Sequence, residues 1–69
     1  MDKIFYNESS SAKLGWTPDW FGASHFDEEL LKKVKLFQKE HGLVDDGLCG
    51  PSTYRRVYTD RVANLEDHA

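Results

Sequence analysis

The chain has to fold without an internal disulfide bond, because its 69 residues include a single cysteine, Cys49. An internal disulfide needs two cysteines, and a chain of this size buries only about 60% of the surface that it exposes when unfolded. Its stability must then come from a dense core, which we expect to be largely helical. The chain is also too short for a separate catalytic lobe, so we expect one small module.

The charge of the chain argues against two classes of partner. Nine basic residues face twelve acidic ones, giving a net charge of -3, so the basic surface typical of nucleic-acid-binding domains is missing. No apolar run approaches the roughly 20 residues that cross a bilayer, and residues 1–8 lack the basic and then apolar order of a signal peptide. We therefore expect a monomer that binds neither nucleic acid nor membrane and that is made in the cytoplasm.

The strongest helical pattern runs from about Asp27 to His41. Acidic residues open this segment, where the positive end of the helix dipole favours them, and Gly42 can end it as a left-handed cap, with Leu43 folding back. An apolar stripe with spacings of four and three consists of Phe26, Leu30, Val34, Phe37 and His41, flanked by Leu31 and Gln38. The pattern predicts an amphipathic helix with both ends marked.

A second helix is predicted after Gly50, because Pro51 is suited to the first helical position. The face expected to pack on the core consists of Tyr54, Val57, Tyr58, Arg61, Val62 and Leu65, whereas Arg55, Arg56 and Asp60 point elsewhere. The preceding loop contains Gly47 and Gly50, for which we predict positive φ angles, and Cys49, which we direct at the core.

The N-terminal third predicts a short helix and an aromatic connector. Serines near Asn7 can cap a short helix that Gly15 ends, after a possible extended pair at Lys3 to Tyr6. Thr17 and Pro18 then start one helical turn. Large apolar side chains that should cover the core are those of Trp16, Trp20, Phe21 and Phe26. The prediction is an all-α, compact three-helix bundle over residues 1–65, with residues 66–69 as a tail or the start of a linker.

The second half of the chain resembles the peptidoglycan-binding domain family. The family pattern, V-x-x-F-Q-x-x-x-G-L-x-x-D-G-x-x-G-x-x-T-x-x-x-V/L, is met at Val34, Phe37, Gln38, Gly42, Leu43, Asp46, Gly47, Gly50, Thr53 and Val57. The Leu14-Gly15-Trp16 step is similar to the end of the family's first helix. One departure stands out: family members often carry the Asp-Gly unit twice, and residues 20–27 replace the first copy with an aromatic-rich stretch.

The resemblance implies a non-catalytic module that targets a linked peptidoglycan hydrolase to the bacterial wall. Many such modules sit at the N-terminus of bacteriophage endolysins, which reach the wall after release by a holin. The family's ligand surface, near the Asp-Gly loop and the start of the final helix, implies here Asp46, Ser52, Tyr54 and Arg55, with Gln38 and Lys39 facing it. Trp16 or Trp20 is an alternative, because an indole can stack on a sugar.

These residues also have structural interpretations. Gln38 is better suited to bridging backbone groups of the loop than to ligand contact. Asp46 is expected to accept hydrogen bonds from loop amides, and Thr53 to satisfy amides at the helix start. A helical protein-interaction module without affinity for the wall is the alternative function.

Metal binding, cofactors and catalysis are not expected. His25 and His41 lack a paired spacing, Cys49 has no C-x-x-C partner, and His68 lies in the tail. Asp45 and Asp46 resemble the start of a calcium loop, but Arg56 stands where its last glutamate should fall. Paired carboxylates need an enclosing cleft to cut a sugar chain, which a module of this size lacks.

Overall fold

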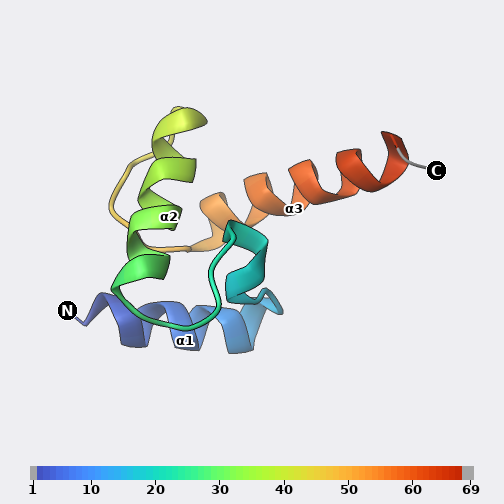
Figure 1. Cartoon of the computed structure of the whole chain (residues 1–69). Helices are drawn as coiled ribbons and strands as arrows, with labels where there is room; N and C mark the ends of the chain where they lie inside the picture. The colour runs from blue at the N-terminus through green and yellow to red at the C-terminus, as the bar shows by residue number, and fades with distance from the viewer. Residues whose placement is uncertain (1, 68–69) are drawn as a thin grey trace.

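The computed structural model describes residues 2–67, with side chains as far as Asn64, and contains three α-helices and one 3-10 helix in that part of the chain (Figure 1). The predicted all-α class is confirmed. Within residues 2–67 there is no strand, and no helix there is long and apolar enough to cross a bilayer. The Lys3–Tyr6 extended pair is therefore wrong.

Helix α1 spans Lys3–Leu14 and is longer than the short first helix expected. Its cap is Asp2 rather than a serine: the Asp2 carboxylate accepts hydrogen bonds from the amides of Ile4 (3.0 Å) and Phe5 (3.1 Å). A carboxylate before the first turn satisfies amides that have no partner within the helix, so the helix can begin at Lys3, well before the serines at positions 9–11. Gly15 ends it with φ 89°, as predicted.

The connector forms the 3-10 helix η1, Pro18–Phe21, and Gly22 ends it with φ 82°. Helix α2 follows at Glu28–Glu40, within a residue of the prediction at each end. The Asp27 carboxylate caps it through the Leu30 amide (3.2 Å). At the other end the Leu43 amide donates to the Gln38 carbonyl (2.8 Å), the long hydrogen bond of a Schellman cap, which Gly42 permits.

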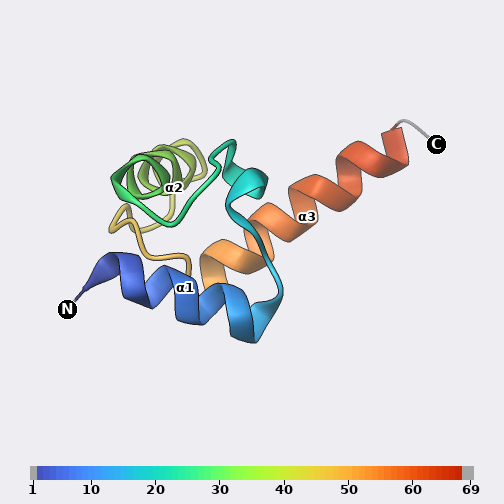
Figure 2. The ribbon, with the colours of Figure 1, turned by 60° about the horizontal axis from the view of Figure 1, so that its bottom comes forward.

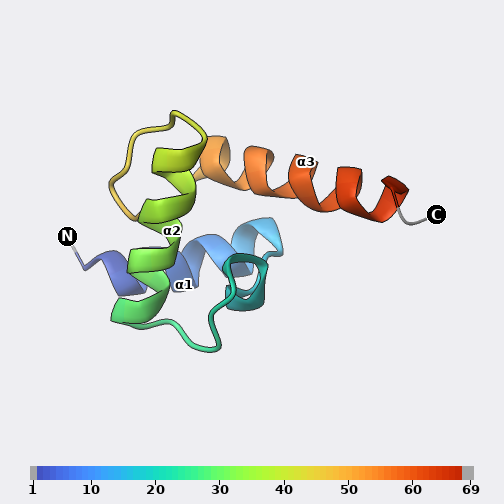
Figure 3. The same cartoon turned by 45° about the horizontal axis from the view of Figure 1, so that its top comes forward.

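Helix α3, Pro51–Asp67, begins at the predicted proline and extends past residue 65. Figures 1, 2 and 3 show its C-terminal half projecting beyond α1 and α2, which gives the molecule extents of 40 × 24 × 19 Å. Asp60, which we expected to point away from the other helices, lies instead against the end of α2. Its Oδ2 is 2.8 Å from Nε2 of His41. This contact and the aromatic rings near Trp20 brace the helix where it leaves the core.

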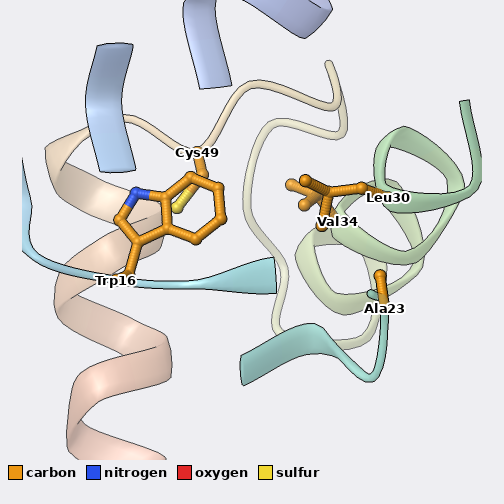
Figure 4. Close-up of a cluster of buried hydrophobic side chains, with 5 residues drawn as sticks. All are labelled: Trp16, Ala23, Leu30, Val34 and Cys49. Atoms are coloured by element: carbon orange, nitrogen blue, oxygen red, sulfur yellow. The ribbon is translucent and has the colours of Figure 1, made fainter. Parts of the chain in front are cut away.

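The apolar part of the core is small. Leu30 and Val34 point from α2 toward the indole of Trp16 and toward Cys49, as Figure 4 shows. Trp16 is fully buried, and Trp20, Phe21 and Phe26 pack against this cluster, so the predicted covering role of the aromatics is confirmed. The interior also contains Val57 and a set of buried polar side chains, those of Asn7, Ser10, Gln38 and Thr53. Gln38 therefore belongs to the core and not to the flank of the α2 stripe.

Candidate functional site

The loop before α3 has no strand beside it, so side chains must satisfy its backbone groups. Gln38 of α2, which is 1% exposed, satisfies two of them: its Oε1 accepts from the Gly47 amide (2.9 Å) and its Nε2 donates to the Leu48 carbonyl (3.0 Å). The same Nε2 lies 3.0 Å from Oγ1 of Thr53 and 3.2 Å from Oδ1 of Asp46. The bridging role preferred for Gln38 is confirmed, since both its amide oxygen and its amide nitrogen bind groups of the loop.

Helix α1 holds the same loop from the opposite direction. Asn7, also 1% exposed, donates from Nδ2 to the Gly47 carbonyl (3.0 Å) and accepts at Oδ1 from the Cys49 amide (2.9 Å). The Ser10 hydroxyl donates to the Cys49 carbonyl and accepts from Nε1 of Trp16 (3.0 Å). Two buried amides, one from each helix, thus replace the neighbouring strand that a loop of this kind would otherwise need.

Asp46 completes the set by accepting the Leu48 amide at Oδ1 (2.9 Å), as predicted from the sequence. With this bond, each backbone amide and carbonyl from Gly47 to Cys49 has a partner. We expected Thr53 to satisfy amides at the start of α3, but it does not. Its hydroxyl oxygen instead accepts a hydrogen bond from the Gln38 amide. The loop is consequently a fixed surface, since burial leaves no alternative partners for these groups.

The two loop glycines are needed for different reasons. Gly47 has φ 79°, which confirms the prediction for it, and a side-chain carbon there would lie 3.4 Å from Cγ of Lys35. Gly50 does not have a positive φ, so that prediction is wrong. A side-chain carbon at Gly50 would lie 2.9 Å from the Tyr6 hydroxyl, so a larger residue here requires the Tyr6 side chain to move.

A groove of about 440 Å³ opens over this loop, between α1, the end of α2 and the start of α3. Its walls are partly apolar, with Leu43, Val44 and Pro51, and partly polar, with Tyr6, Asp46 and Ser52. Val44 is 77% exposed, although it is an aliphatic residue. An exposed aliphatic side chain in a groove with a rigid floor is the arrangement expected of a ligand-binding surface.

The structure divides the residues expected to bind ligand into two groups. Gln38, Asp46 and Ser52 line the groove, Gln38 as part of its buried floor. Arg55 is exposed on α3, three positions after Ser52 and so on the same side of the helix. Trp20 and Tyr54 lie elsewhere, in the aromatic cluster described next.

This aromatic cluster joins η1 to α3. The rings of Trp20 and Tyr54 stack with centroids 5.8 Å apart, and Tyr58 lies 6.4 Å from Trp20. Cζ of Arg61 lies 4.4 Å from the centroid of a Trp20 ring. These contacts occupy Trp20 within the protein, so the aromatic-rich stretch that departs from the family pattern has a packing role: it braces α3 against the connector.

Tyr6 and Val44 are among the groove residues that sequence reasoning missed. Tyr6 was placed in an extended segment, which hid that it shares α1 with Asn7 and Ser10. The signal that could have found it is the spacing of Asn7, Ser10 and Leu14, which is that of one helix face but is carried by polar side chains. Val44 follows the α2 cap directly, and a large aliphatic residue in an exposed turn is itself a cue.

The remaining chemistry of the described residues is limited. They contain no group of three or more histidine, cysteine or acidic side chains that could hold a metal ion, and His68 lies outside the described residues. Burial raises the pKa of the Cys49 thiol to about 12, so the thiol stays protonated and is a poor nucleophile at neutral pH. Cys49 is therefore a core residue, as expected from its neighbours.

Residues 12–57 match the model of a protein family described as "Putative peptidoglycan binding domain". The chain is also similar to a curated protein, N-acetylmuramoyl-L-alanine amidase CwlM of Mycobacterium tuberculosis, with 38% identity over 47 residues. The aligned segment covers 65% of this chain but only 12% of the amidase, so the chain corresponds to a small part of that relative. No solved structure matches the chain.

Proposed function

The chain belongs to the peptidoglycan-binding domain family, and on that premise we propose that its groove binds the peptidoglycan of a bacterial cell wall. The observation that carries this proposal is the groove itself, whose floor is a loop fixed by Asn7 and Gln38. A fixed floor lowers the entropy lost on binding, and the mixture of Val44 with Asp46 and Ser52 suits a ligand of mixed polarity.

The module itself is non-catalytic, and the protein that carries it is a cell-wall hydrolase. The similarity to an amidase supports this, because a wall-binding module raises the local concentration of a linked enzyme at its insoluble substrate. A phage endolysin acting after holin-type release is one such hydrolase, and this narrower proposal has only the family resemblance behind it.

The test is co-sedimentation of the isolated module with purified sacculi, together with a turbidity assay. We expect the module to sediment with the walls and the turbidity to stay constant. Clearing of the walls by this chain alone would contradict the non-catalytic assignment, and full recovery in the supernatant would favour the protein-interaction alternative.

A matched pair of variants tests whether the groove is the site. Val44→Ser removes an exposed aliphatic side chain from the groove, and Leu36→Ser removes one that is 57% exposed on α2, beside a separate hollow near Trp20. Each methyl group buried by a ligand contributes about 0.8 kcal/mol, so Val44→Ser, which removes two, should weaken binding about fourfold if the ligand buries one and about fifteenfold if it buries both. Leu36→Ser should leave it unchanged.

Two further variants address the other residues expected to bind ligand. Arg55→Ala should weaken sacculus binding slightly and leave the melting temperature unchanged, because Arg55 is exposed on α3 one turn after the groove residue Ser52. If Val44→Ser and Arg55→Ala both bind normally while a folded Trp20→Ala does not, the ligand site belongs to the aromatic cluster instead.

A further inference from the structure

A second hollow, of about 270 Å³, adjoins the groove along α1. Two residues, Tyr6 and Pro51, line both hollows, so the two meet where the Tyr6 ring lies next to the first residue of α3. The second hollow adds Ser9, Lys13 and Leu14, all from α1. Together the two hollows form an elongated path from the Asp-Gly loop to the C-terminal half of α1.

The two ends of this path carry opposite charges. At the loop end lies Asp46, whose Oδ1 accepts both of its hydrogen bonds; among the described residues none is donated to Oδ2. At the α1 end lies Lys13, which is exposed and one residue before the end of the helix. The surface between them is mainly apolar, with Val44, Pro51 and the Tyr6 ring.

We infer that the second hollow is a carboxylate subsite, and that the combined groove takes the peptide stem of peptidoglycan rather than its glycan strand. This inference rests on the proposed wall-binding function. A peptide stem carries ionised carboxylates and, in many walls, a side-chain amine, whereas a chain of N-acetylated sugars between the stems carries neither. Only the peptide complements a surface with a carboxylate at one end and an ammonium at the other.

The path also suits the shape of a peptide. An extended peptide runs about 3.3 Å per residue with side chains on alternate sides, so a short stem can lie along this path with alternate side chains facing the protein. The helix dipole opposes a carboxylate bound at Lys13, because this site lies near the negative end of α1, so the attraction has to come from the lysine itself.

The experiment is a binding titration with two synthetic tetrapeptide stems that differ only at the C-terminal group, a carboxylate in one and an amide in the other. The proteins are the wild type, Lys13→Gln and the control Lys32→Gln, whose exposed lysine lies beside a different hollow. An exposed ion pair is weak, so we expect Lys13→Gln to bind the acid about threefold to fivefold less tightly than the wild type does. The amide should bind all three proteins alike, and Lys32→Gln should match the wild type with both peptides.

Asp46→Asn tests the other end. Asparagine keeps an oxygen for the Leu48 amide, so the loop stays formed while the negative charge is lost. A stem with a free side-chain amine should lose affinity for this variant, and an acetylated stem should not.

The possible failures are distinguishable. Sacculi that do not bind the wild type would refute the proposed function and the inference with it. A second outcome is that the wild type binds both sacculi and stems, with no difference in affinity between the acid and the amide or between Lys13→Gln and the wild type. That result would refute only the carboxylate subsite. Binding to glycan stripped of its peptides, without binding to either stem, would refute the peptide assignment.

Discussion

Replacing Asn7 by alanine should remove a large part of the stability of the module, although position 7 lies far in sequence from the loop that it supports. The change deletes two hydrogen bonds, to the Gly47 carbonyl and from the Cys49 amide, at a site that is 1% exposed. Neither backbone group can turn to water without opening the contact between α1 and the loop. Both would remain buried without a partner.

The magnitude follows from these two groups. A buried backbone group left without a partner costs about 1–3 kcal/mol, so the pair costs about 2–5 kcal/mol. Alanine is the better helix former by roughly 0.6 kcal/mol, which offsets a small part of that loss. A chain of this length has a total stability of roughly 3–10 kcal/mol, so the variant should be marginal at room temperature.

Urea unfolding followed by far-ultraviolet circular dichroism measures the loss. Asn64→Ala is the matched control: it makes the same substitution at an exposed position of α3, and its stability should be unchanged or slightly higher. A second variant, Asn7→Asp, keeps the acceptor for the Cys49 amide but sets a carboxylate oxygen against the Gly47 carbonyl. A protonated carboxyl group can donate to that carbonyl, so Asn7→Asp should be more stable at low pH and lose that stability as pH rises through the pKa of the new group.

A loss of less than about 1 kcal/mol in Asn7→Ala would refute the reasoning, because it would mean that the loop finds other partners or water at little cost. An Asn7→Asp variant equally unstable at all pH values would show that Asn7 fills space and that its donor group is unimportant.

Four other predictions concern the same region. Gly47→Val should lower the free energy of unfolding by more than about 1 kcal/mol, because Gly47 has a positive φ that valine resists. Gly50→Ala should also lose stability, and the double variant with Tyr6→Phe should recover it, because that change removes the clashing hydroxyl. Thermal melts test both predictions. Burial raises the pKa of Cys49 from 9.0 to about 12, so between these values the folded state keeps a proton that the unfolded state loses. The free energy of unfolding should therefore fall as pH rises from about 9 toward 12. Urea titrations of Cys49→Ala should lack this dependence on pH. A shortened protein that begins at Ala12 contains the whole segment matching the family but neither Asn7 nor Ser10, and its circular dichroism should show it largely unfolded.

The ends of the helices were the most predictable part of the fold. Each end of α2 is marked by residues that act locally, Asp27 at the start and Gly42 at the finish, so the bounds could be placed to within a residue. The start of α1 could not be placed in the same way, because the face of α1 that points into the protein is polar. Periodicity arguments register apolar residues, and on α1 the buried side chains are those of Asn7 and Ser10.

The site was predictable only where its residues are close in sequence. Asp46 accepts a hydrogen bond from an amide two residues away, and the Asp-Gly pair in the sequence predicts the turn that makes this possible. The part of the groove formed by Tyr6 depends on contacts between α1 and the loop some forty residues later, which no local pattern contains. Gly50 shows the same limit: its sequence context suggested backbone strain, and the actual reason is the hydroxyl of a residue at the other end of the chain.

The support of the loop by Asn7 also sets the order of events when the chain is made. Gly47 and Cys49 are synthesised 40 and 42 residues after Asn7, so the Asn7 side chain cannot bind its partners in the loop until residue 49 has been made. Closing a loop of that length costs entropy before any contact repays it, which makes this docking the slow step we expect in folding. A ribosome-bound fragment ending before the loop would have helices but no groove, and the ability to hold a ligand would arise in a single late event.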